Sequence, residues 1–448
     1  MQARAGNWPV DAITASCPVG VVLSSWPCLV ACGSLAGSIA ECSLYNLCMR
    51  VLLLNLYFPP DTSATAKMAQ TVVDALSDRH DITVLSGRPS YDPTERRPWH
   101  LWQSEQVGRV RVVRLGSTDY PRFHMRQRLM NYLSYVALAV PRALFVPCDV
   151  VLAMTDPPFA GIVGAVIALL KRKPYVYNIR DLYPDMAVGG SIVKPGLLSR
   201  VWERLHRWAL RRATRVIVLG NDMRARITGK GVDETRVLVV RDGTQIRSPD
   251  ASPPLLDFEV IRAIRGDFRF VLLHAGNLGF YGAWDTLLEA GRKLADDGIG
   301  LVFVGDGAQR ARLQAAAGAR NIRFLDFFPA SKIPSVLAAP DVHLISIKDG
   351  LQGVIVPSKL YGILAAGKPV IAVAPTSTDA VTLGLRQGFS CSASPDAASE
   401  LIAVVRRLSR NADEVEKMSR AALAAAPDYD RVQELKKFVQ IIEEAVRA

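Results

Sequence analysis

The body of this chain is poor in cysteine and lacks any long apolar run. Of seven cysteines, only two lie beyond residue 48, Cys148 and Cys391; the other five are Cys17, Cys28, Cys32, Cys42 and Cys48. So few cysteines exclude a disulfide framework for the body and are typical of a reducing compartment. After residue 48 no stretch of about 20 uninterrupted apolar residues occurs, so the sequence predicts no membrane span there.

Zinc-finger spacings and the aromatic signature of RNA-binding modules are also missing, although the chain is basic. Its 448 residues include 54 Lys and Arg against 42 Asp and Glu, a net charge of +12. A basic surplus favours anionic partners, and without nucleic-acid signatures these are expected to be phosphate groups or lipid, not nucleic acid. Half of the residues are hydrophobic, which excludes general disorder.

The first residues differ in composition from the rest. Residues 12–40 contain no charged side chain, as in a signal peptide or membrane anchor, but Pro18 and Pro27 interrupt them. Met49 then precedes a basic residue and an apolar run, a common start for an α/β domain. We expect residues 1–48 to be a non-native or disordered extension, with an anchor as the alternative.

From residue 49 onward, short apolar runs alternate with amphipathic segments. Apolar runs without polar alternation predict parallel strands buried on both faces, and helices between them predict a doubly wound α/β fold. The expected strands are 50–56, 82–86, 110–114, 149–154, 175–179, 215–219, 269–274, 300–304, 322–326, 341–346 and 369–373. The expected helices include 64–78, 127–145, 159–171, 197–212 and 283–295.

The Pro- and Ser-rich residues 246–268 interrupt this rhythm and predict a linker. We therefore expect two domains, residues 49–245 and 269–428, followed by a final helix within 429–448. Two doubly wound domains in tandem place a ligand site in the cleft where the carboxyl ends of both sheets face each other.

Two glycine-containing turns follow expected strands of the second domain. Glycine at a strand-to-helix turn lets backbone N–H groups approach a phosphate, although a plain tight turn is the alternative. The residues of these turns are Gly276, Asn277, Leu278 and Gly279, and Gly305, Asp306 and Gly307.

A third motif begins at Pro357, which ends an apolar run. Ser358 is expected at a helix N-cap and Lys359 in the first turn. The helix dipole disfavours a cation there unless an anion is bound beside it. Lys359 is thus a candidate phosphate ligand, with a solvated lysine as the alternative.

In combination, the segments of residues 49–446 resemble a family 4 glycosyltransferase with the two-domain GT-B fold. The similarity is greatest to the bacterial branch that builds O-antigen, capsule and exopolysaccharide. The segments that carry the resemblance are residues 58–60 (FPP), 155–158 (TDPP), 181–185 (DLYPD), 276–279 with 284–286, 304–307, and 357–369.

The resemblance implies two Rossmann-like domains facing a central cleft, with the nucleotide sugar on the C-terminal domain, the acceptor on the N-terminal domain, and the last helix crossing back. It implies a retaining hexosyl- or N-acetylhexosaminyltransferase with no obligatory metal or cofactor. The donor would be a nucleotide-diphosphate sugar and the acceptor a polyprenyl-diphosphate-linked saccharide in cell-surface polysaccharide biosynthesis.

The resemblance and the motifs together assign the site residues. Asp181 is expected to orient the acceptor, and Lys359 to stabilise the leaving diphosphate; the alternative for Asp181 is a helix cap or an ion pair with Arg180. Donor-binding residues are Gly276, Asn277, Leu278, Gly279, Gly305, Asp306, Gly307, Pro357, Ser358, Lys359 and Tyr361. Acceptor-side residues are Pro60, Asp61, Thr62, Thr155 and Asp156.

The sequence departs from the family pattern at two points. The family often has two Glu separated by seven residues before the Ala-x-Gly-x-Pro segment, where this chain has Val354 and Gly362. Many members also have a His where Thr155 and Asp156 stand, and we assign no catalytic His. Two alternatives therefore stay open: a GT-B-fold nucleotide-sugar 2-epimerase, and a non-catalytic sugar-nucleotide-binding subunit.

Basic charge concentrates in two segments. Residues 120–148 contain no acidic residue, and residues 194–215 contain seven Lys or Arg but only one acid, Glu203. Both include aromatic residues, such as Trp202 and Trp208. This combination predicts a surface for anionic lipid, hence a cytoplasmic enzyme held peripherally at the inner face of the bacterial membrane; a solvated helix is the alternative.

Overall fold

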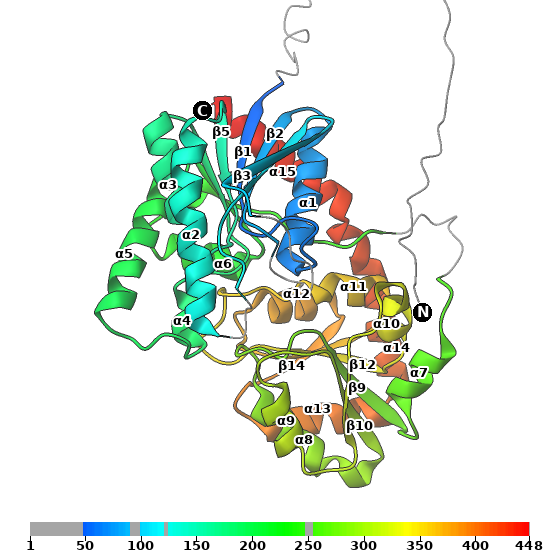
Figure 1. Cartoon of the computed structure of the whole chain (residues 1–448). Helices are drawn as coiled ribbons and strands as arrows, with labels where there is room; N and C mark the ends of the chain where they lie inside the picture. The colour runs from blue at the N-terminus through cyan, green and yellow to red at the C-terminus, as the bar shows by residue number, and fades with distance from the viewer. Residues whose placement is uncertain (1–47, 90–98, 121–123, 247–253, 448) are drawn as a thin grey trace, which may run out of the picture. The chain divides into compact units, whose positions relative to one another are not determined.

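The computed structural model describes residues 48–89, 99–120, 124–246 and 254–447 (Figure 1). Residues 48–448 form one compact unit that contains two β-sheets. The expectation for residues 1–48 concerns, apart from Cys48, residues outside the described part.

The first sheet has eight strands in the order β3-β4-β2-β1-β5-β6-β7-β8, all parallel except β3. Its central strands are almost completely buried, which agrees with their apolar sequences. The strands are β1 (Arg50–Leu54), β2 (Asp81–Ser86), β3 (Trp102–Val107), β4 (Val110–Leu115), β5 (Val150–Ala153), β6 (Tyr175–Asn178), β7 (Arg215–Val218) and β8 (Val237–Val239).

Helices cover both faces of this sheet (Figure 1). On one face lie α1 (Ala64–Ser77) and α15 (Arg431–Arg447). On the other lie α2 (Met125–Leu144), α3 (Ala160–Lys171) and α5 (Leu197–Arg212). Two short helices, α4 (Asp185–Gly189) and α6 (Asn221–Thr228), follow β6 and β7 at the carboxyl edge of the sheet.

The second sheet is fully parallel, with the order β11-β10-β9-β12-β13-β14. Its strands are β9 (Phe270–Ala275), β10 (Ile299–Val304), β11 (Ile322–Leu325), β12 (Val342–Ser346), β13 (Val370–Val373) and β14 (Ser390–Ala393). One face packs on α8 (Trp284–Lys293), α9 (Arg310–Ala316) and α13 (Ala398–Arg410). The other packs on α7 (Phe258–Arg265), α10 (Ile333–Ala338), α11 (Lys359–Ala365), α12 (Asp379–Gln387) and α14 (Ala412–Ala425).

Two features join the halves of the chain. The last helix, α15, returns from the second half and packs on β5, β6 and β7 of the first sheet. An apolar cluster also combines residues of the first sheet with Leu351, Val354 and Val381 of the second half. The predicted fold class, two doubly wound domains with a final helix that crosses back, is confirmed.

Three strands and one helix differ from the sequence expectations. The expected strands omit β3, β8 and β14, the first because all six of its residues are exposed and largely polar. The residues expected to form the linker contain α7, which Asp257 caps by accepting hydrogen bonds from the N–H groups of Glu259 and Val260. Val260 and Ile264, four residues apart, bury its apolar face.

None of the helices in the described ranges has the length and apolarity that crossing a bilayer requires.

Candidate active site

A pocket of about 400 Å³ lies between the carboxyl ends of the two sheets. The first half contributes Arg180 and Asp181, which follow β6, and Asp242, which follows β8. The second half contributes residues after β9 and the start of α11. Strand ends of both sheets thus meet at one site, as expected for two doubly wound domains. The second-half residues are His274, Gly276, Asn277, Pro357, Ser358 and Lys359, among others.

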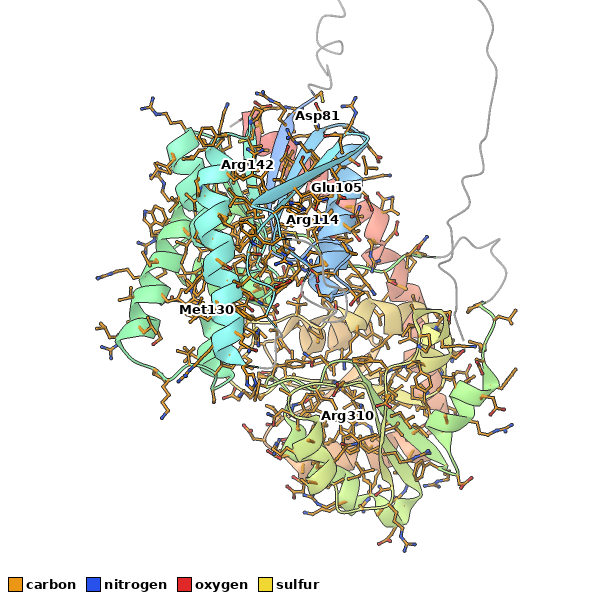
Figure 2. All side chains as sticks on the ribbon, in the orientation of Figure 1. Asp81, Glu105, Arg114, Met130, Arg142 and Arg310 are labelled. Atoms are coloured by element: carbon orange, nitrogen blue, oxygen red, sulfur yellow. The ribbon has the colours of Figure 1, made fainter. Side chains whose placement is uncertain are left out.

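The turns after β9 and β10 are packed tightly together. Gly305 has φ +137°, and a Cβ there would overlap with the carbonyl oxygen of Gly276, so only glycine allows this approach. Arg310, at the start of α9 and labelled in Figure 2, donates to the carbonyl of Gly305 (3.0 Å). It also pairs with Asp326 at 2.6 Å. The second turn therefore supports the first, and Gly276 lines the pocket.

Lys359 is the first residue of α11, as predicted, and its side chain reaches His274 on β9. Lys359 Nζ lies 2.9 Å from His274 Nδ1. Burial lowers the pKa of Lys359 to about 7. Burial, and then the charge of Lys359, lower the pKa of His274 well below its usual value, so its ring is neutral and accepts from the ammonium group. An anion in the pocket would favour the charged lysine.

Ser358 occupies the expected N-cap position but makes no side-chain capping hydrogen bond. It is exposed and lines the pocket beside Lys359. A hydroxyl group that does not cap its own helix remains available to a ligand.

On the part of the pocket that the first half contributes, Arg180 and Asp181 have different partners. The guanidinium of Arg180 contacts both carboxylate oxygens of Asp242 at 2.6 Å. Burial raises the pKa of Asp181 to about 6; the negative charge of Asp156 adds to the rise, and Arg180 opposes it. Asp181 also forms an isolated antiparallel bridge with Ile355 of the second half. A carboxyl group of this pKa can hold or accept a proton near neutral pH.

The other residues expected on the acceptor side do not line the pocket. Thr155 Oγ1 accepts a hydrogen bond from the backbone N–H of Arg180 (2.8 Å) and thereby supports the start of the Arg180–Asp181 segment. The carbonyl of Asp156 accepts from Leu56 N–H (2.8 Å). Near the start of α1, the residues that line the pocket are Ala64 and Thr65, which follow the expected Pro60, Asp61 and Thr62.

Several residues that were expected to bind the donor do not line the pocket. Leu278 is fully buried, and Gly279, Asp306 and Gly307 are absent from the pocket lining. Leu278 N–H donates to the carbonyl of Asp306 (2.8 Å), which joins the two turns. Tyr361 points into the core, where its ring packs 5.2 Å from that of Tyr429. Tyr361 is therefore not part of the pocket lining.

Among the pocket residues that sequence reasoning missed are His274, Asp242 and Tyr281. His274 stands two residues before the first glycine turn, a position that could have indicated a site residue. Asp242 follows β8, a strand of only three residues that the sequence expectations omitted. The Tyr281 hydroxyl donates to the carbonyl of Asn277 and so braces the first turn.

Across the described ranges, no three His, Cys, Asp or Glu side chains gather as ligands for a metal ion would.

Comparison with known proteins assigns both halves. Residues 63–243 match the model of the glycosyl transferase 4-like domain, and residues 261–424 match that of glycosyl transferases group 1. WcaI of Escherichia coli (strain K12), which carries the provisional name of a colanic acid biosynthesis glycosyl transferase, is 22% identical over 379 residues, covering 80% of this chain and 92% of the relative. WbjE of Pseudomonas aeruginosa, named as a probable glycosyltransferase, is 25% identical over 304 residues, covering 66% of this chain and 74% of its own.

Solved structures show the same fold. HepE of Anabaena in complex with UDP has a TM-score of 0.61 at 18% identity, covering 88% of this chain and 100% of that chain. WaaG, a glycosyltransferase involved in lipopolysaccharide biosynthesis, has a TM-score of 0.59 at 16% identity, covering 88% and 99%. With two glycosyltransferase domains in tandem and one pocket between their sheets, this chain is a glycosyltransferase of the GT-B fold.

Proposed function

We propose that the enzyme transfers a sugar, with retention at the anomeric carbon, from a nucleotide-diphosphate sugar to a polyprenyl-diphosphate-linked saccharide in cell-surface polysaccharide biosynthesis. The single observation that carries the proposal is the position of Lys359, a partly buried cation at a helix start, in a pocket lined by both halves. The named relatives support this choice, since WcaI is named for colanic acid biosynthesis and HepE was solved with UDP.

The donor diphosphate would lie against the start of α11 and the turn after β9. There Lys359, the Ser358 hydroxyl and the backbone at Gly276 and Asn277 converge on one pocket. Negative charge grows on the leaving diphosphate as the glycosidic bond stretches. Preorganised donors aimed at that charge stabilise the transition state more than the ground state.

The transfer itself needs one bond to break and one to form. The bond between the anomeric carbon and the phosphate oxygen breaks, and the acceptor oxygen bonds to the same face of that carbon. The acceptor proton passes to the departing phosphate oxygen, so no strong base is required. Asp181, which lines the same pocket from the first half, would hold the acceptor hydroxyl in line through its carboxylate.

A surface on α2 and α5 fits a lipid-linked acceptor and an anionic membrane. Leu197 and Leu198, at the start of α5, are 79% and 76% exposed. On α2, Met130 and three other apolar side chains, Met125, Leu129 and Leu133, are also exposed (Figure 2). Basic residues of α5 line a hollow of about 500 Å³ beside them: Arg200, Arg204, Arg207, Arg211 and Arg212.

Of the two tryptophans expected at this surface, Trp202 packs on Phe159 and Tyr183, with ring centroids 5.1 and 6.0 Å from theirs. Trp208 lines the hollow together with the arginines. Exposed leucines and methionines supply most of the remaining apolar surface. Apolar side chains flanked by arginines suit the boundary between anionic head groups and acyl chains, and we propose peripheral binding to the cytoplasmic leaflet.

The proposal is tested by transfer from labelled nucleotide sugars to a bacterial membrane extract. The donors are UDP-glucose, UDP-galactose, UDP-N-acetylglucosamine and GDP-mannose, and the product is counted in the organic phase. We expect one donor to label a lipid that mild acid cleaves, with the anomeric configuration of the donor retained. A 2-epimerase would instead convert a UDP-sugar without any acceptor, and a binding subunit would give neither product.

A further inference from the structure

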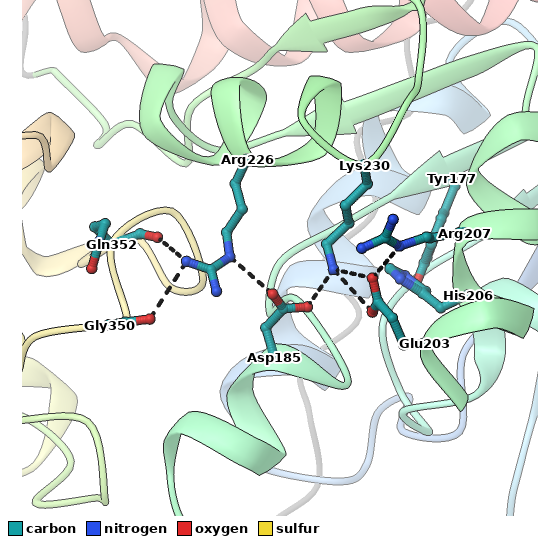
Figure 3. Close-up of polar contacts among 9 residues, drawn as sticks. All are labelled: Tyr177, Asp185, Glu203, His206, Arg207, Arg226, Lys230, Gly350 and Gln352. Carbon is teal, nitrogen blue, oxygen red and sulfur yellow. Dashed lines mark hydrogen bonds and ion pairs between the residues drawn. The ribbon is translucent and has the colours of Figure 1, made fainter. Parts of the chain in front are cut away.

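A segment of the second half, residues 350–355, is bound along one face of α6 in the first half. Arg226 Nη1 donates to the carbonyl oxygens of Gln352 (3.0 Å) and Gly350 (3.4 Å), as Figure 3 shows. One turn earlier on the same helix, the Asp222 carboxylate accepts from the N–H of Gly353. Arg226 and Asp222 of α6, one a hydrogen-bond donor and the other a hydrogen-bond acceptor, thus bind successive backbone groups of the segment.

The backbone of this segment is shaped for that contact. Gly353 has φ +67°, and a Cβ there would overlap with the carbonyl oxygen of Asp222, so another residue would push the segment away. The next carbonyl, that of Val354, accepts from Leu182 N–H (2.9 Å). Beyond it, residues 355–359 line the pocket and lead to Lys359.

The other end of Arg226 is held by the acceptor side. Arg226 Nε donates to Asp185 Oδ1 at 2.9 Å, and Lys230 Nζ lies 2.7 Å from Asp185 Oδ2 (Figure 3). Lys230 is buried and also contacts Glu203 of α5 at 2.8 Å. Burial alone would raise the pKa of Asp185, but Lys230 and Arg226 hold it below its usual value, so the carboxylate stays ionised.

We propose that Arg226 is a positioning residue that fixes the donor-side segment 350–359 relative to Asp181. Asp185 belongs to the same short stretch as Asp181, so a single guanidinium ties that stretch to the segment leading to Lys359. The proposal rests on the proposed function, because it takes the pocket as the place of transfer. Arg226 acts through these contacts and is not part of the pocket lining. A misplacement of about 1 Å between reacting groups can lower a rate about 100-fold.

The test compares Arg226→Ala with Arg224→Ala. Arg224 lies on the same helix but pairs with Glu234 at 3.3 Å on the surface, which makes it a matched control. The measurements are kcat with the nucleotide sugar transferred in the membrane-extract assay, the Kd for UDP, and hydrogen–deuterium exchange of residues 350–356.

For Arg226→Ala we expect kcat to fall about 100-fold, the Kd for UDP to change less than about threefold, and exchange in residues 350–356 to speed up. Arg224→Ala should match the parent in all three. If Arg226→Ala does not fold, Arg226→Lys becomes the decisive variant. It keeps the ion pair with Asp185 but loses the second N–H donor, which contacts the segment, and we expect about a tenfold lower kcat.

Unchanged kcat in the decisive variant would overturn the proposal. A loss of UDP affinity as large as the loss of kcat would overturn it too, because that result indicates a damaged donor site and not misalignment. If the parent transfers no sugar at all, the proposed function fails. The exchange measurement needs no activity and still reports whether Arg226 holds the segment.

Discussion

The folded protein disfavours the charged form of the Lys359 amino group, and the resulting loss of stability can be measured. Burial lowers its pKa from 10.5 in the unfolded chain to about 7. Between those two values the unfolded state binds more protons than the folded state, so stability rises with pH through this window. The penalty is fully present below about pH 7 and absent above about pH 10.5.

The size of the penalty follows from the two pKa values. The difference between 10.5 and about 7 corresponds to about 5 kcal/mol, of which about 4 kcal/mol applies at pH 7.5. The pocket is open to water, which screens the charge of Lys359, so we take about half of that penalty, ~2 kcal/mol. The unit of about 400 residues gives an unfolding entropy of ~0.8 kcal/mol per degree. Lys359→Met should therefore raise Tm by about 2–3 °C at pH 7.5.

The same substitution should remove function. Loss of one preorganised donor to the leaving diphosphate typically lowers the rate by about 10² to 10³. Lys359→Arg should restore only part of it, because a planar fork does not replace a point charge. UDP at about 100 times its Kd stabilises the parent by ~2.7 kcal/mol, or about 3 °C, and the Met variant should lose most of this shift.

Thermal unfolding from pH 6.5 to 10, with and without UDP, measures these effects. Lys417→Met, at an exposed position on α14, serves as the control and should change nothing. A lower Tm for Lys359→Met at pH 7.5 would mean that the contact with His274 stabilises the charged lysine, which refutes the burial argument. Full transfer activity in that variant would refute the phosphate assignment.

Three further predictions concern other parts of the molecule. Burial raises the pKa of Asp222 to about 6, so the stability of the folded protein falls as pH rises from about 4 to 6. Asp222→Asn should therefore have a higher Tm than the parent at pH 7.5, and thermal unfolding over a pH series should show that this gain disappears near pH 4. Asp181→Asn should lower kcat about tenfold or more, and the decline of parent kcat below pH 6 should be absent from its pH profile. Leu198→Ser with Arg200→Glu and Arg204→Glu should weaken sedimentation with phosphatidylglycerol vesicles about 30-fold or more, whereas phosphatidylcholine vesicles should bind parent and variant equally poorly.

Most of the fold could be predicted from the sequence because its strands are buried on both faces. In such strands nearly every residue is apolar, and the runs at β1, β5 and β10 are visible without knowledge of their neighbours. β3 forms only through its antiparallel pairing with β4, and its own residues carry no apolar signal. α7 was not predicted because it lies in a stretch whose Pro and Ser content suggests a linker, although Asp257 marks its start.

The site could be predicted in part for a related reason. Asp181 and Lys359 come at strand or helix ends that topology brings to one edge, so their meeting in one pocket follows from the fold. The partners of these residues do not follow from it. His274 lies 85 residues from Lys359 in sequence, and Asp242 lies 62 residues from Arg180. Only the packed structure brings each pair together.

These pairings decide how charge is distributed in the pocket. Asp242 neutralises Arg180 through two contacts of 2.6 Å, which leaves little of that positive charge for a ligand. Lys359 faces a neutral ring instead of a carboxylate. We propose that, among the residues that line the pocket, attraction for a diphosphate centres on Lys359. The carboxylate of Asp181, which lines the same pocket from the first half, would repel the diphosphate. This asymmetry would orient the nucleotide sugar with its leaving group toward α11 and its sugar toward the acceptor.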